Sequence, residues 1–375
     1  MSRLAMSNRN KLKIGIFGTN VSSGLSMTTV PERWMMTWDD NVAVAQMADA
    51  CGIDFLLPVG RWKGYGGALD FEGTTFETIT WAAGLLALTK RITVFGTVHA
   101  PMFHPVIAAK QMVTADHIGQ GRFGLNFLAA WNEGEFEMFG LRQRDHAERY
   151  AFGDAWIRAL KRMWTDDDFD LADEYFDFKG VRLKPKPYGG SRPMIINAGR
   201  SEAGRAFAIR NCDAYFVGVR TIEFDESTGR MSAEFADAAR EVVAVRAEAG
   251  RLGREIGVYT RSEIVCRPTQ REAFDYFRYW ADDHVDQDAV EYELEVSVGI
   301  PKGTPEFERA RLSRRRRFPV IGDPDYVAGF IAKISAAGFD GLAISFLNYL
   351  DELPFFSDEV LPRLERLGLR EPAAA

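Results

Sequence analysis

The stretch GRFGLNFLAAWNEGE, residues 121–135, joins a Gly-rich turn, an apolar run and a polar cluster. One polar residue, Asn126, interrupts the apolar run. A strand that is apolar on both faces is typical of a parallel sheet that is covered on both sides. In such folds, polar groups at the carboxyl end of a strand line the site. We therefore expect a strand here, with the cluster at residues 131–135 forming the floor of an active site.

Seven further apolar runs predict strands elsewhere in the chain, and helical patterns lie between them. The alternation favours a single (β/α)8 TIM barrel, because a doubly wound sheet rarely uses eight regularly spaced βα units. We expect one domain over residues 1–375, with an insertion of helical pieces around 271–319 and a hairpin at 175–187. The seven strands are expected at residues 11–17, 54–59, 91–99, 193–198, 213–219, 257–266 and 341–347. The helices are expected at 32–50, 76–89, 105–117, 149–164, 231–250 and from 323–324 to 338.

Composition excludes several classes of protein. The chain has 375 residues, 46% hydrophobic and 26% charged, with a net charge of −7. This balance argues against nucleic acid as a partner, and the one basic run, residues 314–317, is predicted to be a solvated loop or an anion contact. Three well-separated cysteines indicate neither disulfides nor a zinc site and fit a reducing cytoplasm. The sequence shows neither an apolar signal segment nor a membrane-spanning run.

The familiar catalytic motifs are absent or misplaced. The pattern GxGxxG occurs at residues 119–124, but it precedes a predicted strand, whereas a dinucleotide site requires it after a strand and at the start of a helix. The sequence contains no GxSxG, HExxH or P-loop pattern, and its five histidines do not fall at metal-ligand spacing. We therefore predict no hydrolase triad and no metal site.

A better phosphate candidate is GRSEAG, residues 199–204, which follows a predicted strand and opens a helix. Free N–H groups at a helix start bind phosphate oxygens, and Arg200 and the Ser201 hydroxyl can add to this. The alternative is an ordinary helix start, with Ser201 as the N-cap and Gly204 allowing close packing. The pattern alone does not decide between them.

Four polar residues in or beside predicted strands are further candidates. Asn126 and Thr97 sit within apolar strands, where an amide needs a hydrogen-bond partner and a threonine is an ordinary strand residue. Arg61 follows the second strand and Arg261 lies in the seventh. Each arginine either binds an anion at the barrel mouth or pairs with a nearby acid such as Glu263.

Four segments together resemble the luciferase-like flavin-dependent monooxygenases. They are FLLPVGRWKGYGG at 55–67, FGTVHAPMFHPVIAAKQMVTADHIGQGRFGLNFLAAWNEGEFEMFG at 95–140, ERY at 148–150 and INAGRSEAG at 196–204. The resemblance extends from about residue 11 to 367 and is strongest over 53–204. Within the family, it is closest to the branch of pyrimidine, alkanesulfonate and dimethylsulfone monooxygenases.

The resemblance implies a TIM barrel that uses reduced FMN supplied by a separate NAD(P)H-dependent flavin reductase and oxygenates a small substrate with O2. It also implies a homodimer or homotetramer. The positions that match FMN-contacting residues of the family are Gly60, Arg61, Asn126, Glu135, Arg149, Tyr150 and Ser201. Thr97 and Asn126 match the pair that holds O2 beside the flavin in the pyrimidine enzyme.

Arg261 matches a catalytic arginine of the sulfonate enzymes. Where those enzymes carry a histidine shortly after that arginine, this chain has Glu263. The expected activity is therefore that of a cytoplasmic, FMNH2-dependent two-component monooxygenase acting on a pyrimidine-like heterocycle or an organosulfur compound. The alternatives are a deazaflavin-dependent barrel oxidoreductase and a non-catalytic flavin-binding protein.

Overall fold

A computed structural model of the chain describes residues 6–219, 223–225, 230–232, 235–314 and 319–372. Most of the basic run at 314–317 lies outside these ranges. Within them, nine strands pair in one parallel sheet, and eight of the nine close into a barrel because β8 also pairs with β11. The barrel strands are β1 (Lys13–Phe17), β2 (Phe55–Leu57), β3 (Thr93–His99), β4 (Phe123–Leu128), β7 (Met194–Asn197), β8 (Ala214–Phe216), β11 (Gly257–Cys266) and β13 (Gly341–Ser345).

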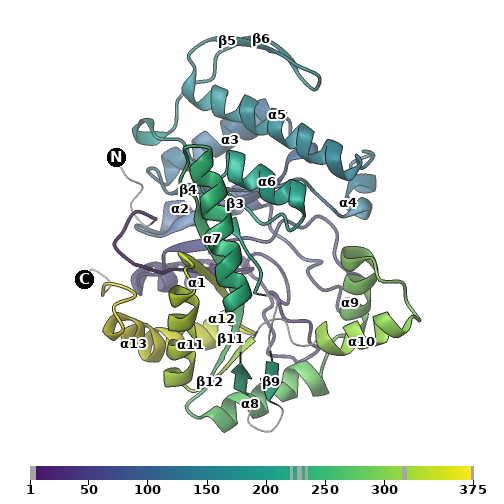
Figure 1. Ribbon diagram of the computed structural model, residues 1–375, viewed down its shortest axis with the longest axis vertical. Helices are drawn as coiled ribbons and strands as arrows, with labels where there is room; N and C mark the ends of the chain where they lie inside the picture. Colours follow the sequence, from purple (N-terminus) through teal and green to yellow (C-terminus); the bar gives the residue numbers. More distant parts are fainter. Residues whose placement is uncertain (1–5, 220–222, 226–229, 233–234, 315–318, 373–375) are drawn as a thin grey trace.

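Helices surround the barrel and cover its outer face (Figure 1). Each predicted strand coincides with one barrel strand, so the (β/α)8 prediction is confirmed. The covering helices are α1 (Trp38–Ala50), α2 (Thr78–Leu88), α3 (Pro105–Ile118), α5 (His146–Thr165), α6 (Glu202–Asn211), α7 (Ala236–Arg251), α11 (Pro324–Ala336), α12 (Tyr349–Phe355) and α13 (Leu361–Arg366). Helix α1 is capped by Thr37 and ends before Gly52, whose φ of 79° is the left-handed conformation usual after a helix.

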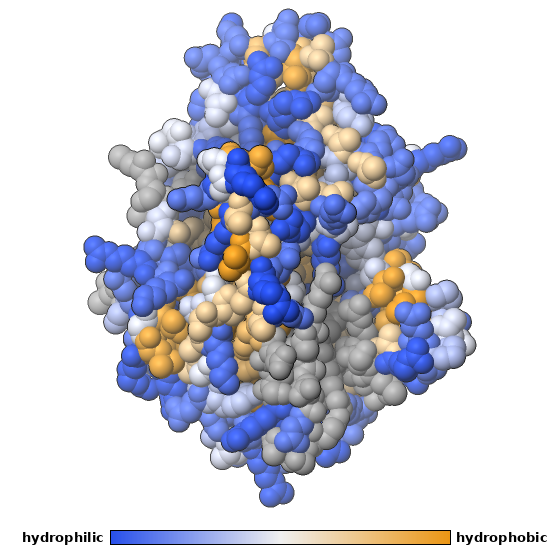
Figure 2. Space-filling model, viewed as in Figure 1, coloured by the Kyte–Doolittle hydropathy of each residue, from blue (hydrophilic) through white to orange (hydrophobic). Residues whose placement is uncertain are grey.

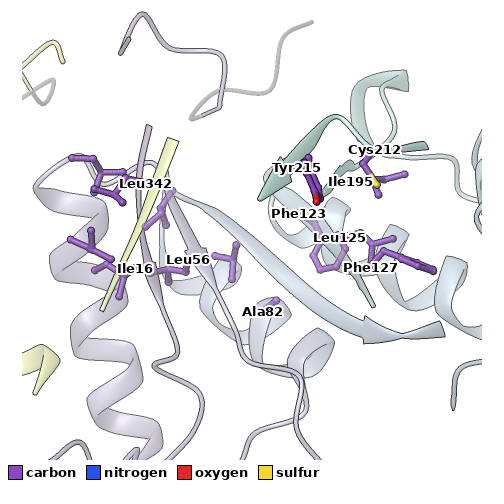
Figure 3. Packing of buried hydrophobic residues seen from close by; sticks show 14 of the residues in the cluster. Ile16, Leu56, Ala82, Phe123, Leu125, Phe127, Ile195, Cys212, Tyr215 and Leu342 are labelled. Carbon is purple, nitrogen blue, oxygen red and sulfur yellow. The ribbon is translucent and has the colours of Figure 1, made fainter. Parts of the chain in front are cut away.

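Alternation along the strands separates the two faces of the barrel wall. In β4, Phe123, Leu125 and Phe127 point outward into the large core between strands and helices, where Figure 3 shows them gathered with Ile195 of β7. Inward-facing residues form a separate cluster that includes Phe55, Phe95 and Tyr259. Because successive residues of a strand point to opposite faces, the residues two positions beyond Phe95 and Tyr259 also face the barrel interior.

The structure corrects several predicted boundaries. The hairpin is formed by β5 (Phe169–Ala172) and β6 (Asp177–Val181), so it begins earlier than 175–187; it projects at the top of Figure 1. Strand β12 (Pro319–Gly322), which pairs with β11, was not predicted. Helices α1 and α7 begin later than expected. In place of the predicted start of α7, residues 230–232 form β10 (Arg230–Ser232), which pairs with β9 (Glu223–Asp225).

Helical segments fill the chain between β11 and β12. Those after residue 286 pack on the long loop that follows β2, through a cluster that includes Tyr65 and Phe71 of the loop and Leu294 and Phe307 of the helices. Figure 2 shows apolar residues over the α9 region, as one of several apolar patches on this face. The segments are α8 (Gln270–Arg278), η3 (Tyr279–Asp283), α9 (Gln287–Tyr292), η4 (Glu293–Val298) and α10 (Pro305–Arg314).

Candidate active site

Thr97 and Asn126 lie side by side on the inner wall of the barrel. They are directly opposite each other in the β3–β4 pairing, and their exposed fractions are 4% and 7%. Thr97 is two residues beyond the inward-facing Phe95, so both side chains face the barrel interior near the carboxyl ends of their strands. The structure therefore brings together the two residues expected to hold oxygen.

The hydrogen bonds of this pair fix where its protons lie. The Thr97 hydroxyl donates to the carbonyl of Pro58 at 2.6 Å, so its single proton is committed. Asn126 Nδ2 must then be the donor in the 3.1 Å contact with Thr97 Oγ1, which sets the orientation of the amide. Asn126 Oδ1 is left buried without a protein partner in the described part of the chain. A buried acceptor of this kind is costly unless a ligand satisfies it.

Arg61 is held at the barrel mouth by two carboxylates and two aromatic rings. Its Nε and Nη2 both lie 2.7 Å from Glu72 Oε2, and its Nη1 lies 3.6 Å from Glu135 Oε1. Its guanidinium carbon lies 5.0 Å from the ring centre of Tyr65 and 5.3 Å from that of Trp131. Burial works to lower the pKa of Arg61, but Glu72, Tyr65 and Glu135 outweigh it and raise the pKa, so the side chain is a fixed cation.

Glu135 lies in the first turn of α4 (Glu133–Met138) and connects the loops that follow β2 and β4. Its Oε1 accepts the Trp62 N–H at 2.8 Å, and its side chain is 1% exposed. Burial raises the pKa of Glu135, although the Trp62 hydrogen bond and the Arg61 charge oppose this. His99 Nε2 lies 3.8 Å from Glu135 Oε2, but burial, with a contribution from Arg61, lowers the pKa of His99 to about 3. At neutral pH the His99 imidazole is therefore uncharged, and the contact is not an ion pair.

Gly60 packs directly on these residues. A Cβ at this position would lie 2.8 Å from Thr97 Cγ2 and 3.0 Å from His99 Cε1. Any larger residue would have to displace one of the two side chains. Glycine is therefore required by the close approach of the chain to Thr97 and His99.

Ser201 and Tyr150 form a second group at the start of α6, and Arg149 precedes Tyr150 on α5. Ser201 is the N-cap, and its Oγ accepts the Gly204 N–H at 3.1 Å. The Tyr150 hydroxyl hydrogen-bonds with Ser201 and lies 2.5 Å from where a Cβ at Gly199 or Gly204 would be. Burial raises the pKa of Tyr150, so its hydroxyl keeps its proton. The N-cap alternative is thus confirmed, and it leaves the other N–H groups of the first turn able to bind an anion.

Arg149 connects the two groups through the loop that follows β4. Its Nη1 donates to the carbonyl of Ala130 at 2.8 Å, and the next residue, Trp131, stacks on Arg61. Its Nε is buried without a protein partner in the described ranges. Ala130 has a φ of 63°, a conformation that costs a residue other than glycine about 1–2 kcal/mol. Such strain is common where a loop positions a site.

Arg261 is not part of either group. It lies on β11, four strands away from β3 in either direction around the barrel, and so on the opposite wall. It is two residues beyond the inward-facing Tyr259 and two before Glu263, so all three share one face. Glu263 accepts a hydrogen bond from the Ser26 hydroxyl. Arg261 and Glu263 thus belong to the far side of the same barrel mouth.

Sequence reasoning missed Glu72 and His99 as members of the site, whereas Tyr65, Trp62 and Trp131 are aromatic residues that the sequence suggests as walls of a flat ligand pocket. Glu72 belongs to a loop whose path no local pattern reveals. His99 could have been identified from the sequence, because it lies two residues after Thr97 on the same predicted strand and therefore on the same face. Among the described residues, no group of three or more His, Cys, Asp or Glu is placed to hold a metal ion. No helix in the same ranges is long and apolar enough to cross a membrane.

The arrangement offers two distinct kinds of binding. The barrel wall presents unpaired polar atoms of neutral side chains, whereas the start of α6 presents N–H groups and hydroxyls suited to an anion. A ligand with a polar ring system and an anionic tail would satisfy both groups at once.

Comparison with known proteins gives matches over most of the chain. The family model described as luciferase-like monooxygenase matches residues 12–341. An FMNH(2)-dependent dimethylsulfone monooxygenase of Pseudomonas fluorescens (strain Pf0-1) is 28% identical over 98% of each chain. The pyrimidine monooxygenase RutA of Enterobacter sp. (strain 638) is 26% identical over 94% of this chain and 96% of its own. A solved riboflavin lyase (RcaE) has a similar fold, with a TM-score of 0.83 at 21% identity, covering 97% of this chain and 94% of its own.

Proposed function

The chain belongs to the luciferase-like monooxygenase family, and we propose that it is an FMNH2-dependent monooxygenase that oxygenates a small organic substrate with O2. One observation supports this most strongly. The buried Thr97–Asn126 pair, with its unpaired amide oxygen, lies on the same barrel mouth as the anion cradle at Ser201. The expected activity, enzyme class and cofactor follow from the family and from this site together.

The residues present fit FMN. The cradle of Gly199, Ser201 and Gly204 would receive the phosphate, with Tyr150 and Arg149 beside it. Asn126 Oδ1 would accept an N–H group of the ring system, and this would satisfy an acceptor that has no partner among the described residues. Arg61 and Glu135 would line the ring, and Gly60 would contact it through its backbone. Bound reduced FMN supplies two electrons for the reduction of O2, with one oxygen atom passing to the substrate and the other to water.

The side chains of this protein bind, orient and exclude water around that chemistry. The Thr97 hydroxyl, whose proton is held by Pro58, and the remaining N–H of Asn126 would contact oxygen without supplying a strong acid. Arg61 would contribute a fixed positive charge, since Glu72 and Glu135 hold it in place. Arg261 and Glu263 would contact the substrate from the opposite wall. These roles are carried by residues from four different strands or their following loops.

We propose either a pyrimidine-like heterocycle or an organosulfur compound as substrate, in keeping with the two relatives. A separate NAD(P)H-dependent flavin reductase would supply FMNH2, and we propose that the protein works beside it in the cytoplasm. We further propose a homodimer or homotetramer. The chain would act as one domain, with the helices between β11 and β12 as an insertion that supports the loop carrying Arg61.

A reductase-coupled assay tests the proposal. The purified protein, FMN, NADH and a flavin reductase are incubated with uracil, dimethylsulfone and an alkanesulfonate, and products are read by mass spectrometry. The expected result is an oxygenated product that depends on all components. Binding of a deazaflavin in preference to FMN would instead support a barrel dehydrogenase, and FMN binding without any oxygen-dependent turnover would support a non-catalytic flavoprotein.

A further inference from the structure

His99 is a buried side chain beside the oxygen pair whose place in the site the proposed function does not use. It is the last residue of β3, two positions beyond Thr97 on the same face, and it is 2% exposed. Its Nδ1 and Cε1 edge faces Gly60, since a Cβ there would lie 3.0 Å from Cε1 and 3.5 Å from Nδ1. Nδ1 has no hydrogen-bond partner among the described residues.

The surroundings of His99 determine what Nδ1 can do. The imidazole is neutral at physiological pH, because burial and the Arg61 charge disfavour its cationic form. A neutral imidazole has one N–H and one bare nitrogen. Its Nε2 points toward a carboxylate oxygen of Glu135 at 3.8 Å, which favours the proton on Nε2. Nδ1 is then a hydrogen-bond acceptor to which no group in the described part of the chain donates.

We propose that His99 Nδ1 and Asn126 Oδ1 form a pair of acceptors that receives N–H groups of the bound ligand. The inference rests on the proposed function, since it assigns a role at the same barrel mouth. Both atoms are buried and unpaired, both belong to neutral side chains, and they lie on neighbouring strands. The N–H groups would come either from the ring system of the flavin or from an amide of a heterocyclic substrate. His99 is thus a ligand-contacting residue in addition to those identified by the sequence.

Two isosteric variants separate the two ring nitrogens. His99→Asn keeps a carbonyl oxygen near the position of Nδ1, whereas His99→Gln places it near Nε2 and leaves Nδ1 without a replacement. We expect His99→Asn to bind within about threefold of wild type and His99→Gln to lose about tenfold, the value of one hydrogen bond of about 1.4 kcal/mol. His117→Asn, on the exposed end of α3, is the control and should leave the flavin Kd and the substrate KM unchanged.

Two readouts distinguish the source of the N–H group. Anaerobic fluorescence titration gives the Kd for FMN and FMNH2, and steady-state assays give KM for substrate. A loss confined to flavin Kd assigns the N–H to the flavin, and a loss confined to KM assigns it to the substrate. Equal affinities in the two variants, or a greater loss in His99→Asn, would overturn the proposal. Flavin binding without oxygenation by wild-type protein would contradict the proposed function alone, because the Kd comparison would still be interpretable.

Nitrogen NMR of the wild-type protein tests the same inference without a substitution. With 15N-labelled histidine, the His99 Nδ1 resonance should be that of an unprotonated nitrogen and should move upfield when the ligand donates to it. A protonated Nδ1, or an Nδ1 resonance unchanged by saturating FMNH2 and by substrate, would overturn the assignment.

Discussion

Replacing Glu72 by glutamine tests how Arg61 is held at the barrel mouth. Glu72 Oε2 accepts from Arg61 Nε at 2.7 Å, and the two side chains are only 4% and 7% exposed. Removing one partner of a buried ion pair costs about 3–5 kcal/mol, because the remaining charge is uncompensated. Glu135 stays 3.6 Å from Arg61 and the new amide can still accept a hydrogen bond. We therefore expect Glu72→Gln to lower the free energy of unfolding by about 2–3 kcal/mol.

Urea unfolding measures this effect directly. Asp168→Asn is the control, because it breaks an exposed ion pair with Arg182 that has a similar N–O distance of 2.6 Å. It should leave the urea midpoint unchanged. The double variant Arg61→Met/Glu72→Gln should be less destabilised than the sum of the single variants, because neither charge is left alone. Two results would refute the view that Glu72 holds a buried cation in place. One is a urea midpoint for Glu72→Gln equal to that of wild type. The other is a loss of stability in the double variant equal to the sum of the losses in the two single variants.

Three further predictions concern the cradle, the substrate wall and pH. Gly204→Ala should weaken FMN binding in a fluorescence titration and destabilise the fold by about 1–3 kcal/mol, because the new Cβ would lie 2.5 Å from the Tyr150 hydroxyl. The control Gly329→Ala, in open space on α11, should leave FMN binding unchanged. Glu263→Gln should raise kcat/KM for an alkanesulfonate relative to a neutral sulfone, because it removes a buried negative charge from the barrel mouth, and an unchanged ratio would contradict this. The free energy of unfolding of wild type, relative to that of His99→Asn, should fall as the pH drops from about 6.5 toward 3, by up to about 1.4 kcal/mol per pH unit. The reason is that only the unfolded chain protonates His99 in that pH window. If the free energies of unfolding of the two proteins changed equally with pH, the buried imidazole would not be neutral.

The barrel was predictable from sequence because its strands are buried on both faces. Continuous apolar runs such as residues 123–128 do not fit the pattern of an amphipathic helix, so they predict strands, and each predicted strand was found. Strand β12 has the same buried character, but its four residues lie between the basic run and the start of the next predicted helix, and no strand is predicted there. Helix α7 was predicted too long at its start, since local propensity does not exclude the pairing of β10 with β9. Tertiary pairing of this kind is not encoded in a local window.

The site was only partly predictable for a related reason. The family resemblance pairs Thr97 with Asn126, and the sequence at the helix start allows Ser201 to be either an N-cap or part of a phosphate site. The partners of Arg61 could not be predicted in this way, because Glu72 and Glu135 reach it from two loops whose geometry depends on packing against other segments. The neutral state of His99 likewise depends on burial, which only the folded structure reveals.

Oxygen-isotope labelling tests the central claim most directly. The protein is loaded anaerobically with FMNH2, mixed with 18O2 and a substrate panel of uracil, dimethylsulfone and an alkanesulfonate, and the products are analysed by mass spectrometry. A monooxygenase should place one 18O atom in the product of at least one substrate, and the Asn126→Ala variant should lose most of this product. Unlabelled product, or oxidation of all the FMNH2 with no substrate consumed, would contradict the claim that this barrel oxygenates a small molecule.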